Sequence, residues 1–597
     1  MRRLSSSPSR RILVLIGVVT FVQIVAFLLF RKNADISALS QYFNNPLLPE
    51  EQEYEEGRTA NSSIIEGVVQ RIGTFWSTSK QLPKPFVYNP VDTSDITACD
   101  GPPLSLASTR ELYAYPASAM PAGFPDPAVG DHNIIGINRD VCFTSSSRYN
   151  PYGWKDKDTK TEWPEVKWGE LQQKCLQRNQ HRFKADGEAG TKKPRQAVVL
   201  RGHEKFKWRP NDFIYTRSLI AELSLASGGE YEVIFMIQLN DPEHRNLTTA
   251  DLQNPSIVEP LKERYVPAEF RDLVIFFNTN VLKKTYPKVG EWSYVMQSYQ
   301  PVQWLAQSRS EFTHFWVIEQ DFRIIGHNYE FFNSVGEWAR KQPRENLWEI
   351  SSQLYIPAVH KTWDNFVQII KQNTPGQGVL GPQPPPQTVN YSSFAPALPL
   401  PSPVPKDWGV GEDADVISLS RIWDPVGSGW VFETYMKVFP KDTPRRTSPP
   451  NSGRFSRRTL MLTHEGQVKH GTCVAGEATN PTTALHHGLK AVYVPHPLYF
   501  DEDIDPKELY KAFSGHEAGE AFNTSSAHFG MAIPNSKKNR WRRLTFSWQN
   551  QLAEELYKWW TMSNGTNTKV HESPSGRRVP AHEPCFPAMA LHPIKDV

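Results

Sequence analysis

Two carboxylates separated by one residue, Glu319 and Asp321, follow the apolar run Phe315 to Ile318. The run is aromatic and β-branched, which is typical of a buried strand, so both acids are expected at or just past its end. Side chains two residues apart in an extended chain point the same way, and Gln320 points the other way. Adjacent carboxylates repel unless a cation or a shared proton neutralises them. The spacing predicts a site for Mg²⁺ or Mn²⁺; the alternative is a solvated loop.

A second acidic group, Glu412, Asp413 and Asp415, lies behind two glycines and directly before the apolar segment Val416 to Leu419. This order indicates a tight loop that leads into a packed element. The alternative is an acidic helix N-terminus, where the helix dipole stabilises negative charge without any chemistry.

Two adjacent histidines, His486 and His487, end a helix-like segment just before a strand expected over Ala491 to Val494. A single histidine in such a place is usually structural. A pair at a helix end beside a sheet can reach a metal ion, so both are candidate ligands.

Alternating strands and helices must position these groups. We expect strands over Ala197–Arg201, Tyr231–Leu239, Leu273–Phe277 and Phe315–Ile318. Asn211 or Asp212 can cap the helix that follows the first strand, and Gly228 with Gly229 can end it. The first two strands then form a parallel βαβ unit. The repeated alternation predicts an α/β protein with a doubly wound sheet, in which ligands bind beyond the carboxyl ends of the strands.

The sequence also predicts two further helices and a segment that runs back across the domain. Tyr294 to Ala306 reads as a helix that Pro301 interrupts, and Tyr329 to Arg340 reads as an uninterrupted helix. Leu347 to Ile356 is expected to run back across the domain.

The N-terminus carries the near-continuous apolar run Ile12 to Phe30, which is long enough to span a bilayer. Arginines precede it without any acidic residue, so the positive-inside rule leaves a short tail in the cytoplasm and the body in a lumen. This predicts a single-pass type II protein of the Golgi or another secretory-pathway membrane. A cleaved signal peptide is the alternative. No second run of this length occurs, which excludes a polytopic transporter.

The domain organisation follows from these patterns. We expect a cytoplasmic tail over 1–11, a membrane anchor over 12–30, a stem over 31–88 and an irregular N-terminal cap over 89–193. The α/β domain is expected over 194–500 with a Pro-rich insert at 374–405, which is solvent-exposed and would be a lid if it lay beside a site. A C-terminal extension over 501–597 carries an amphipathic helix at Leu552 to Trp560 that should pack on the body.

Composition excludes several classes of function. The 597 residues carry a net charge of +3, with no arginine-rich run or RNA-binding signature, so nucleic acid is not an expected partner. A phosphate-binding loop and a nucleophile elbow are both missing from the sequence, which argues against a P-loop ATPase and an α/β hydrolase. The five cysteines are too widely spaced for a zinc motif. In an oxidising lumen one or two bridges should form, Cys99 with Cys142 being one pairing, and one thiol must be left over.

Five N-x-Ser/Thr sequons lie on the expected lumenal side, at Asn61, Asn246, Asn390, Asn523 and Asn564. We predict that the expressed protein is membrane-bound and that endoglycosidase increases its mobility on a gel. Unmodified Asn246 and Asn523, together with cleavage of the body by protease added from the cytosolic side, would show that the topology is wrong.

The order of several motifs resembles a fungal family of unknown function with membrane-anchored members. The motifs are Ala197–Arg201, Glu222–Gly229, Trp316–Gly326, Gly411–Asp415 and His486–Pro497, and the resemblance covers about Cys99 to Pro497 or beyond. That family in turn resembles GT-A glycosyltransferases, which implies a GT-A-like doubly wound mixed sheet flanked by helices.

The GT-A resemblance also implies roles for particular residues. Glu319 and Asp321 match the motif that holds a divalent metal, Mn²⁺ or Mg²⁺, on the diphosphate of a nucleotide sugar, although Glu319 replaces an Asp. Arg201 and Asp321 are expected to bind the nucleotide sugar. A later acidic motif supplies the catalytic base in inverting members, which would be Glu412 or Asp413. A later histidine completes the metal shell, which would be His486 or His487.

The resemblance thus implies a lumenal glycosyltransferase that moves a sugar from a nucleotide sugar to a glycan or glycoprotein acceptor. Such a reaction builds negative charge on the leaving diphosphate, which a metal ion stabilises, while a carboxylate removes the proton of the acceptor hydroxyl. Two alternatives use the same residues. One is an inactive, membrane-anchored binding or scaffold protein, and the other is a metal-dependent hydrolase.

Overall fold

The computed structural model describes residues 82–102, 112–121, 124–154, 161–183, 192–374, 378–383, 405–428, 430–450, 452–500, 505–514, 544–547, 552–561 and 583–595. All of them belong to one of the two units into which the chain divides, Phe75–Val597. The expected tail, the run Ile12 to Phe30, most of the stem and most of the Pro-rich insert lie outside these ranges. Within them, no helix combines the length and the apolar character that a membrane crossing needs.

The central element is a seven-stranded sheet with the order β13-β9-β11-β7-β4-β5-β6. Its strands are β4 (Arg195–His203), β5 (Tyr231–Leu239), β6 (Val274–Asn278), β7 (Phe312–Glu319), β9 (Val416–Ser418), β11 (Gly453–Ser456) and β13 (Ala491–Tyr493). β11 runs antiparallel to both of its neighbours, and every other pair in the sheet is parallel. The expected α/β fold with a mixed sheet is therefore confirmed.

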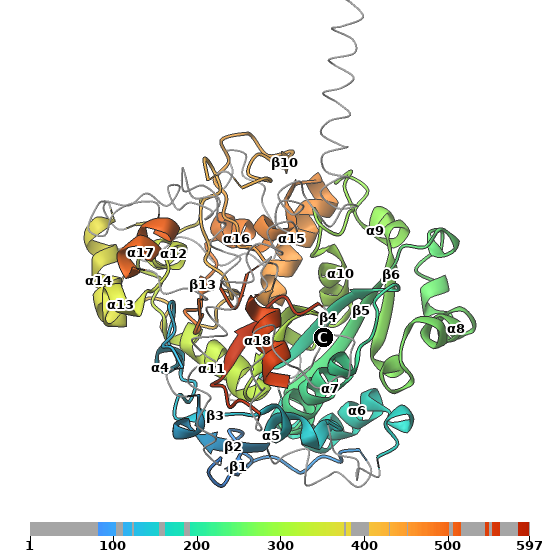
Figure 1. The fold of residues 1–597 in the computed structure, drawn as a ribbon. Helices are drawn as coiled ribbons and strands as arrows, with labels where there is room; N and C mark the ends of the chain where they lie inside the picture. The colour runs from blue at the N-terminus through green and yellow to red at the C-terminus, as the bar shows by residue number, and fades with distance from the viewer. Residues whose placement is uncertain are drawn as a thin grey trace, which may run out of the picture. The chain divides into compact units, whose positions relative to one another are not determined.

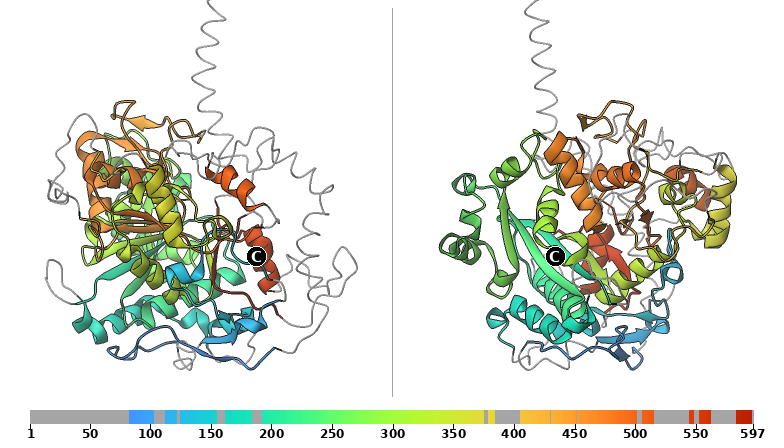
Figure 2. Two further views of the ribbon diagram at one scale, coloured as in Figure 1. Left: turned by 90° about the vertical axis from the view of Figure 1, so that its left-hand side faces the viewer. Right: turned by 180° about the vertical axis from the view of Figure 1, so that it is seen from behind.

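Helices cover both faces of this sheet (Figures 1 and 2). One side carries α6 (Trp168–Asn179), α7 (Pro210–Leu219), the π-helix Ile220–Leu225 and α11 (Asn328–Lys341), and the other carries α10 (Gln300–Ser308), α15 (Arg457–His470) and α16 (Gly476–His487). The remaining α-helices of the described residues are α4 (His132–Ile135), α5 (Ser145–Tyr149), α8 (Pro255–Tyr265), α9 (Thr279–Thr285), α12 (Leu347–Ser352), α13 (Pro357–His360), α14 (Trp363–Asn373), α17 (Pro506–Ser514) and α18 (Leu552–Thr561). Smaller sheets contain β1 (Phe86–Tyr88), β2 (Leu112–Pro116), β3 (Val141–Cys142), β8 (Arg323–Ile325), β10 (Met436–Lys437), β12 (Cys473–Val474) and β14 (Met589–Leu591).

The first βαβ unit follows the sequence closely. β5 has the predicted bounds, β4 pairs with it in parallel, and Gly228 and Gly229 end the helix with φ of 69° and 87°. The expected cap is wrong: α7 begins at Pro210, so its N-cap is Arg209 and not Asn211 or Asp212, and the backbone N–H of Arg209 donates to the Asp212 carboxylate at 2.8 Å. Asp212 therefore satisfies the helix start from inside the first turn.

Three further expectations differ from the structure. Pro301 is the second residue of α10, which begins at Gln300, and it does not interrupt the helix because a backbone N–H in the first turn has no helical acceptor. The segment Leu347 to Ile356 forms the short helix α12 and then irregular chain. The supposedly irregular segment 89–193 contains β2, β3 and α6, whose buried side chains include Trp168 and Gln172.

β7 places the first pair of carboxylates. His314 to Ile318 are all buried, as expected of a central strand covered on both faces, and Glu319 is the last residue of the strand. Across the β4–β7 pair, Arg201 lies directly opposite Glu319. These two strands lie where the order of strands along the sheet reverses direction. In doubly wound sheets, the crevice beyond the carboxyl ends at this point is where ligands bind.

The C-terminal part packs on this core. α18 buries Ala553, Leu556, Tyr557 and Trp560, which confirms the predicted amphipathic helix. β14 pairs antiparallel with β8, so the end of the chain returns to the strand that follows the Glu319 turn.

Trp560→Ala should lower the free energy of unfolding by about 3 to 5 kcal/mol. The indole is fully buried, packs against Tyr149 at 5.3 Å between ring centroids and donates to the Phe143 carbonyl at 2.8 Å. Urea unfolding measures the loss. Glu555→Ala on the exposed side of α18 is the control, with an expected change within about 0.5 kcal/mol; equal effects of the two changes would refute the packing.

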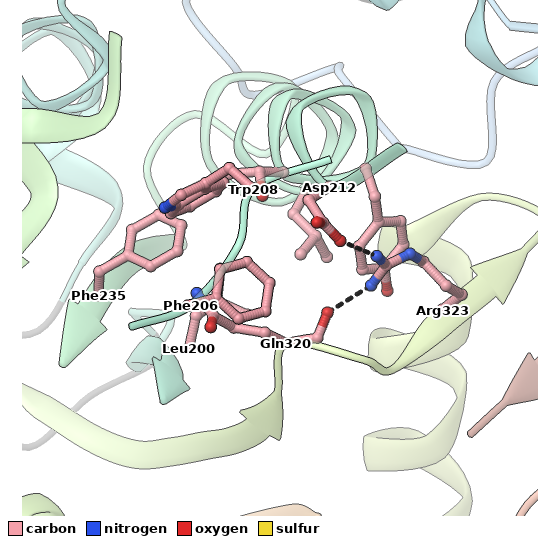
Figure 3. A pocket seen from close by; sticks show the side chains of 10 residues that line it. Leu200, Phe206, Trp208, Asp212, Phe235, Gln320 and Arg323 are labelled. Carbon is pink, nitrogen blue, oxygen red and sulfur yellow. Dashed lines mark hydrogen bonds and ion pairs between the residues drawn. The ribbon is translucent and has the colours of Figure 1, made fainter. Parts of the chain in front are cut away.

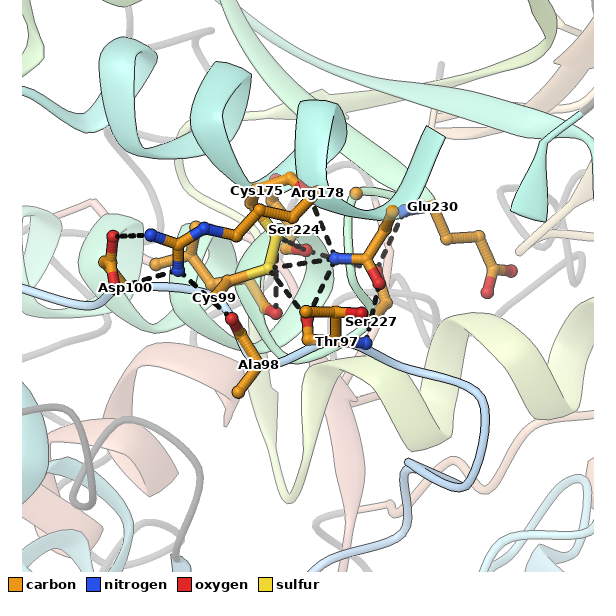
Figure 4. Close-up of a disulfide and its surroundings, with 12 residues drawn as sticks. Thr97, Ala98, Cys99, Asp100, Cys175, Arg178, Ser224, Ser227 and Glu230 are labelled. Carbon is orange, nitrogen blue, oxygen red and sulfur yellow. Dashed lines mark hydrogen bonds and ion pairs between the residues drawn. A yellow bond between two sulfur atoms is a disulfide. The ribbon is translucent and has the colours of Figure 1, made fainter. Parts of the chain in front are cut away.

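Two disulfides join distant parts of the described chain, Cys99–Cys175 (Figure 4) and Cys142–Cys585. The predicted Cys99–Cys142 pairing is wrong. Cys99 lies beside α6, where Arg178 pairs with Asp100, so its partner is on that helix. Cys473 is the thiol left over, and it is buried. Asn246 is the sequon within the described ranges, and it is exposed.

Candidate metal centre

Arg201 and Glu319 form the first part of the site. They end neighbouring parallel strands in register, and Arg201 Nη2 lies 3.2 Å from Glu319 Oε1. Arg201 is buried, and its Nη1 donates to the Ser298 carbonyl at 3.0 Å. The rings of Tyr294 and Tyr299 lie 5.2 and 5.8 Å from its guanidinium carbon. Its Nε has no hydrogen-bond partner in the part of the chain that the structure describes.

His592 joins the two carboxylates of the predicted motif. Its Nε2 lies 3.0 Å from Glu319 Oε2 and 3.2 Å from Asp321 Oδ1. On the other side of the ring, Nδ1 lies 2.6 Å from the Ser547 carbonyl oxygen, to which it donates. This contact fixes the ring so that Nε2 is the atom presented to the carboxylates, which is how metal-binding histidines are commonly oriented.

Charge couples these three residues. Burial opposes the positive charge of His592, but Asp321 and Glu319 outweigh it and raise the pKa of the imidazole well above its usual range. Burial likewise opposes the negative charge of Asp321, and His592 more than compensates, so the pKa of that carboxyl is lowered. Without a metal ion, an imidazolium therefore neutralises the repulsion between the two carboxylates.

The geometry of the three residues fits a divalent ion. One ligand atom from each of Glu319, Asp321 and His592 lies within 4.8 Å of the others. Two atoms that both bind one ion at about 2.0 to 2.6 Å are separated by at most roughly 5 Å. The two carboxylate oxygens would suit Mn²⁺ or Mg²⁺, and the imidazole nitrogen would favour Mn²⁺, a transition metal, over Mg²⁺.

Gln320 points away from this cluster, as the sequence predicts. Its side chain faces Gly202 on β4, where a Cβ atom would lie 2.5 Å from Gln320 Oε1, and it lines a small pocket on the α7 side of the sheet (Figure 3). Arg323 donates to the Gln320 carbonyl at 2.5 Å and pairs with Asp212. These contacts hold the turn that carries Asp321 between its two flanking strands.

Glu477 is a further carboxylate at the site. It lies in the first turn of α16, next to Gly476, where a Cβ atom would lie only 2.5 Å from Ser298 Oγ. This close approach places the start of α16 against the residue whose carbonyl holds Arg201. Burial and the negative charge of Glu319 raise the pKa of Glu477 to about 8, and a hydrogen bond from Trp430 acts in the opposite direction.

The structure places Glu412 and Asp413 at the other edge of the sheet. They precede β9, which runs in the same direction as β7, so they lie where the parallel strands begin, whereas Glu319 lies where β7 ends. Glu412 pairs with Arg344 at 2.6 Å, and Asp413 pairs with Arg340 at 2.9 Å. Glu412 and Asp413 therefore do not lie beside Glu319 and Asp321, as the sequence had predicted, because β9 crosses the sheet after them.

His486 and His487 also lie far from the cluster. They end α16, and about 1.5 Å of rise per residue puts them roughly 15 Å from Glu477 at its start. His486 Nε2 lies 2.7 Å from the Pro444 carbonyl oxygen, and burial lowers the pKa of its imidazole to about 4. The expected contact of either histidine with Glu319 is not formed.

Sequence reasoning therefore found Glu319, Asp321 and Arg201 but missed His592 and Glu477. Glu477 had a usable signal, since Gly476 and Glu477 directly follow a short apolar segment and begin a helical pattern. His592 had none, because its contact with Glu319 joins residues 273 positions apart.

Comparison with known proteins places the chain in a family. The model of the family described as "Protein of unknown function (DUF3405)" matches residues 142–596, a range that contains Glu319, Asp321, Glu477 and His592. Among curated proteins, none matches the chain. The expected membership of a family of unknown function is confirmed. Because the matched range covers well over half of the sequence, the chain belongs to the family described as "Protein of unknown function (DUF3405)".

Proposed function

We propose that this protein is a metal-assisted glycosyltransferase with a GT-A-like core, which transfers a sugar from a nucleotide sugar to a glycan or glycoprotein acceptor. The observation that carries the proposal is the cluster of Glu319, Asp321 and His592 beyond the carboxyl end of β7. It lies at the reversal of strand order, where doubly wound sheets bind their ligands.

The charges of the cluster suit a diphosphate. Glu319 and Asp321 contribute two negative charges, and Arg201 contributes one positive charge beside them. A divalent ion held by the two carboxylates and a neutral His592 would leave the site with a net positive charge, which attracts a diphosphate and stabilises it as a leaving group. Arg201, whose buried Nε has no partner within the described ranges, supplies a further fixed donor next to that position.

Glu477 is the proposed general base. A base acts best when its pKa lies near the working pH. In the metal-free protein, burial and then the negative charge of Glu319 raise the pKa of Glu477 to about 8, and burial, the larger cause, does not depend on the ion. In this proposal Glu477 accepts the proton of the acceptor hydroxyl as that oxygen bonds to the sugar carbon, and the bond from this carbon to the diphosphate breaks, so that the nucleoside diphosphate leaves with the electron pair. Glu477 takes the role that the sequence resemblance gave to Glu412 or Asp413, because Glu477 lies near Glu319, whereas those two residues lie at the opposite edge of the sheet.

The proposed location is the lumen of the Golgi or another secretory compartment, with Ile12 to Phe30 as the membrane anchor. The two disulfides support it, since such bonds form and persist in oxidising compartments. The apolar N-terminal run with its preceding arginines supports the same orientation.

A thermal-shift screen of the full chain tests the proposal. Nucleoside diphosphates and nucleotide sugars are added with and without Mn²⁺, and at least one nucleotide is expected to raise the melting temperature more with Mn²⁺ than without it. Each nucleotide sugar that stabilises the protein is then incubated with it, with and without candidate acceptors. Sugar transfer that requires an acceptor supports the proposal, release of free sugar without one indicates a hydrolase, and no stabilisation by any nucleotide contradicts both.

A further inference from the structure

We propose that the disulfide Cys142–Cys585 is a positioning device for His592, so that the metal site is complete only when this bridge holds the end of the chain in place. The inference rests on the proposed metal site and concerns residues 583–595, called here the C-terminal arm. The arm supplies the one ligand of the cluster that does not come from the β7 end.

The bridge anchors the start of the arm to the segment around β3. Cys585 bonds Cys142, and the neighbouring Phe586 exchanges two backbone hydrogen bonds with Phe143, at 2.9 and 3.0 Å. Glu583 accepts from the backbone N–H and the hydroxyl of Ser146, at 2.8 and 2.6 Å. Every one of these contacts lies upstream of His592 and touches none of the proposed metal ligands.

The end of the arm is fitted into the site itself. β14 leads from the bridge to His592, and Leu591 lies opposite Arg323, just past the turn that carries Asp321. The backbone N–H of Ile594 donates to the Asp321 carbonyl at 2.8 Å. His592 is also aligned with the segment 544–547 through hydrogen bonds between backbone groups, at 3.1 and 3.2 Å. A shift of the arm along β8 would therefore move the imidazole away from both carboxylates.

The arm's regular pairing is short, which is why a covalent anchor matters. β14 and β8 share three residue pairs, and a strand pair of this length is weakly held when it stands alone. A β-register slip by one residue turns a side chain to the opposite face. Fixing Cys585 removes this freedom for the residues up to His592.

The second disulfide provides a matched control. Cys99–Cys175 ties the chain before β2 to α6, and its surroundings are Thr97, Arg178 and Ser224, none of which contacts the proposed metal ligands (Figure 4). The family match begins at Cys142 and includes Cys585, whereas Cys99 precedes it. Removing either bridge should lower the melting temperature, but only the loss of Cys142–Cys585 should weaken metal binding.

The test uses two double variants of the full chain. One carries both Cys142→Ala and Cys585→Ala, and the other carries both Cys99→Ala and Cys175→Ala. Mn²⁺ is titrated and the free ion is read by electron paramagnetic resonance, at a temperature below the melting point of both variants. We expect the Cys142/Cys585 variant to bind Mn²⁺ about 10- to 100-fold more weakly than the parent, as when a group orienting a ligand is lost. The Cys99/Cys175 variant should match the parent. Equal Mn²⁺ affinity in both variants overturns the inference.

A second measurement covers failure to fold. In the folded Cys99/Cys175 variant the remaining bridge is Cys142–Cys585, and a phosphine reductant opens it after folding. Mn²⁺ affinity should then fall towards the value expected for the Cys142/Cys585 variant while circular dichroism stays unchanged. Unchanged affinity after reduction overturns the inference even if the Cys142/Cys585 variant does not fold. His592→Ala separates this inference from the proposed function. Suppose that the parent binds Mn²⁺, that His592→Ala binds it more weakly, and that the Cys142/Cys585 variant binds it as the parent does. In that case only the positioning role of the bridge fails. If the parent itself binds no Mn²⁺, the proposed function fails.

Discussion

Asp321→Asn is expected to abolish binding of a nucleoside diphosphate with Mn²⁺ while leaving the protein folded. The change keeps the shape of the side chain but removes the charge that pairs with His592 at 3.2 Å and that would hold the metal ion. Losing such a contact costs on the order of 3 kcal/mol, which weakens binding by about 100-fold or more. Isothermal titration with Mn²⁺ and nucleoside diphosphate measures the binding, and circular dichroism checks the fold.

Gln320→Ala is the matched control for that experiment. Gln320 is the neighbour of Asp321, but its side chain faces Gly202 and the small pocket on the α7 side, so binding should stay nearly intact. The metal-free Asn variant should melt below the parent, because the His592 imidazolium loses the carboxylate that most raises its pKa and no unpaired repulsion is relieved. Parent-like binding by Asp321→Asn, or a rise in its metal-free melting temperature, would contradict this account of the cluster.

Glu477→Gln should lower kcat by about 10²- to 10⁴-fold and leave Mn²⁺ binding close to that of the parent. The amide has nearly the shape of the carboxylate, and its oxygen can still accept the hydrogen bond from Trp430. It cannot take up the proton of the acceptor hydroxyl. Glu477 is not one of the three proposed ligands, so the metal should still bind. Initial rates at saturating donor, with a parallel Mn²⁺ titration, separate the two effects.

Glu412→Gln provides the comparison for Glu477. The same chemical change is made at the other edge of the sheet, where Glu412 pairs with Arg344 at 2.6 Å, and kcat should be unaffected there. The free energy of unfolding should fall, because the half-buried ion pair between Glu412 and Arg344 is lost. A large fall in kcat for Glu412→Gln with none for Glu477→Gln would return the base to the position that the sequence resemblance implied.

The sheet could be predicted from the sequence because its signals are local. β5 has the predicted bounds, Gly228 and Gly229 end the preceding helix, and the buried run before Glu319 forms β7. The opposite directions of Glu319 and Gln320 also follow from the period of an extended chain. Each of these features depends on neighbouring residues alone.

The rest of the site depends on how the chain returns to the sheet. Glu412 and His487 had suitable chemistry, but each directly precedes a strand, β9 or β13, that runs in the same direction as β7. Residues that precede such strands lie at the edge opposite to Glu319. His592 reaches the site from the C-terminal arm, and no local pattern marks that path. The bridge that anchors it was likewise not predictable, since 443 residues separate Cys142 from Cys585.

The most direct test of the central claim is a Mn²⁺ titration of the full chain, read by electron paramagnetic resonance, with and without a nucleoside diphosphate, for the parent and His592→Ala. The account predicts saturable binding of one Mn²⁺ by the parent, tightened by the nucleoside diphosphate, and binding at least about 10-fold weaker in the variant. Absence of saturable Mn²⁺ binding by the parent in the presence of nucleoside diphosphate, or equal affinity in His592→Ala, would contradict it.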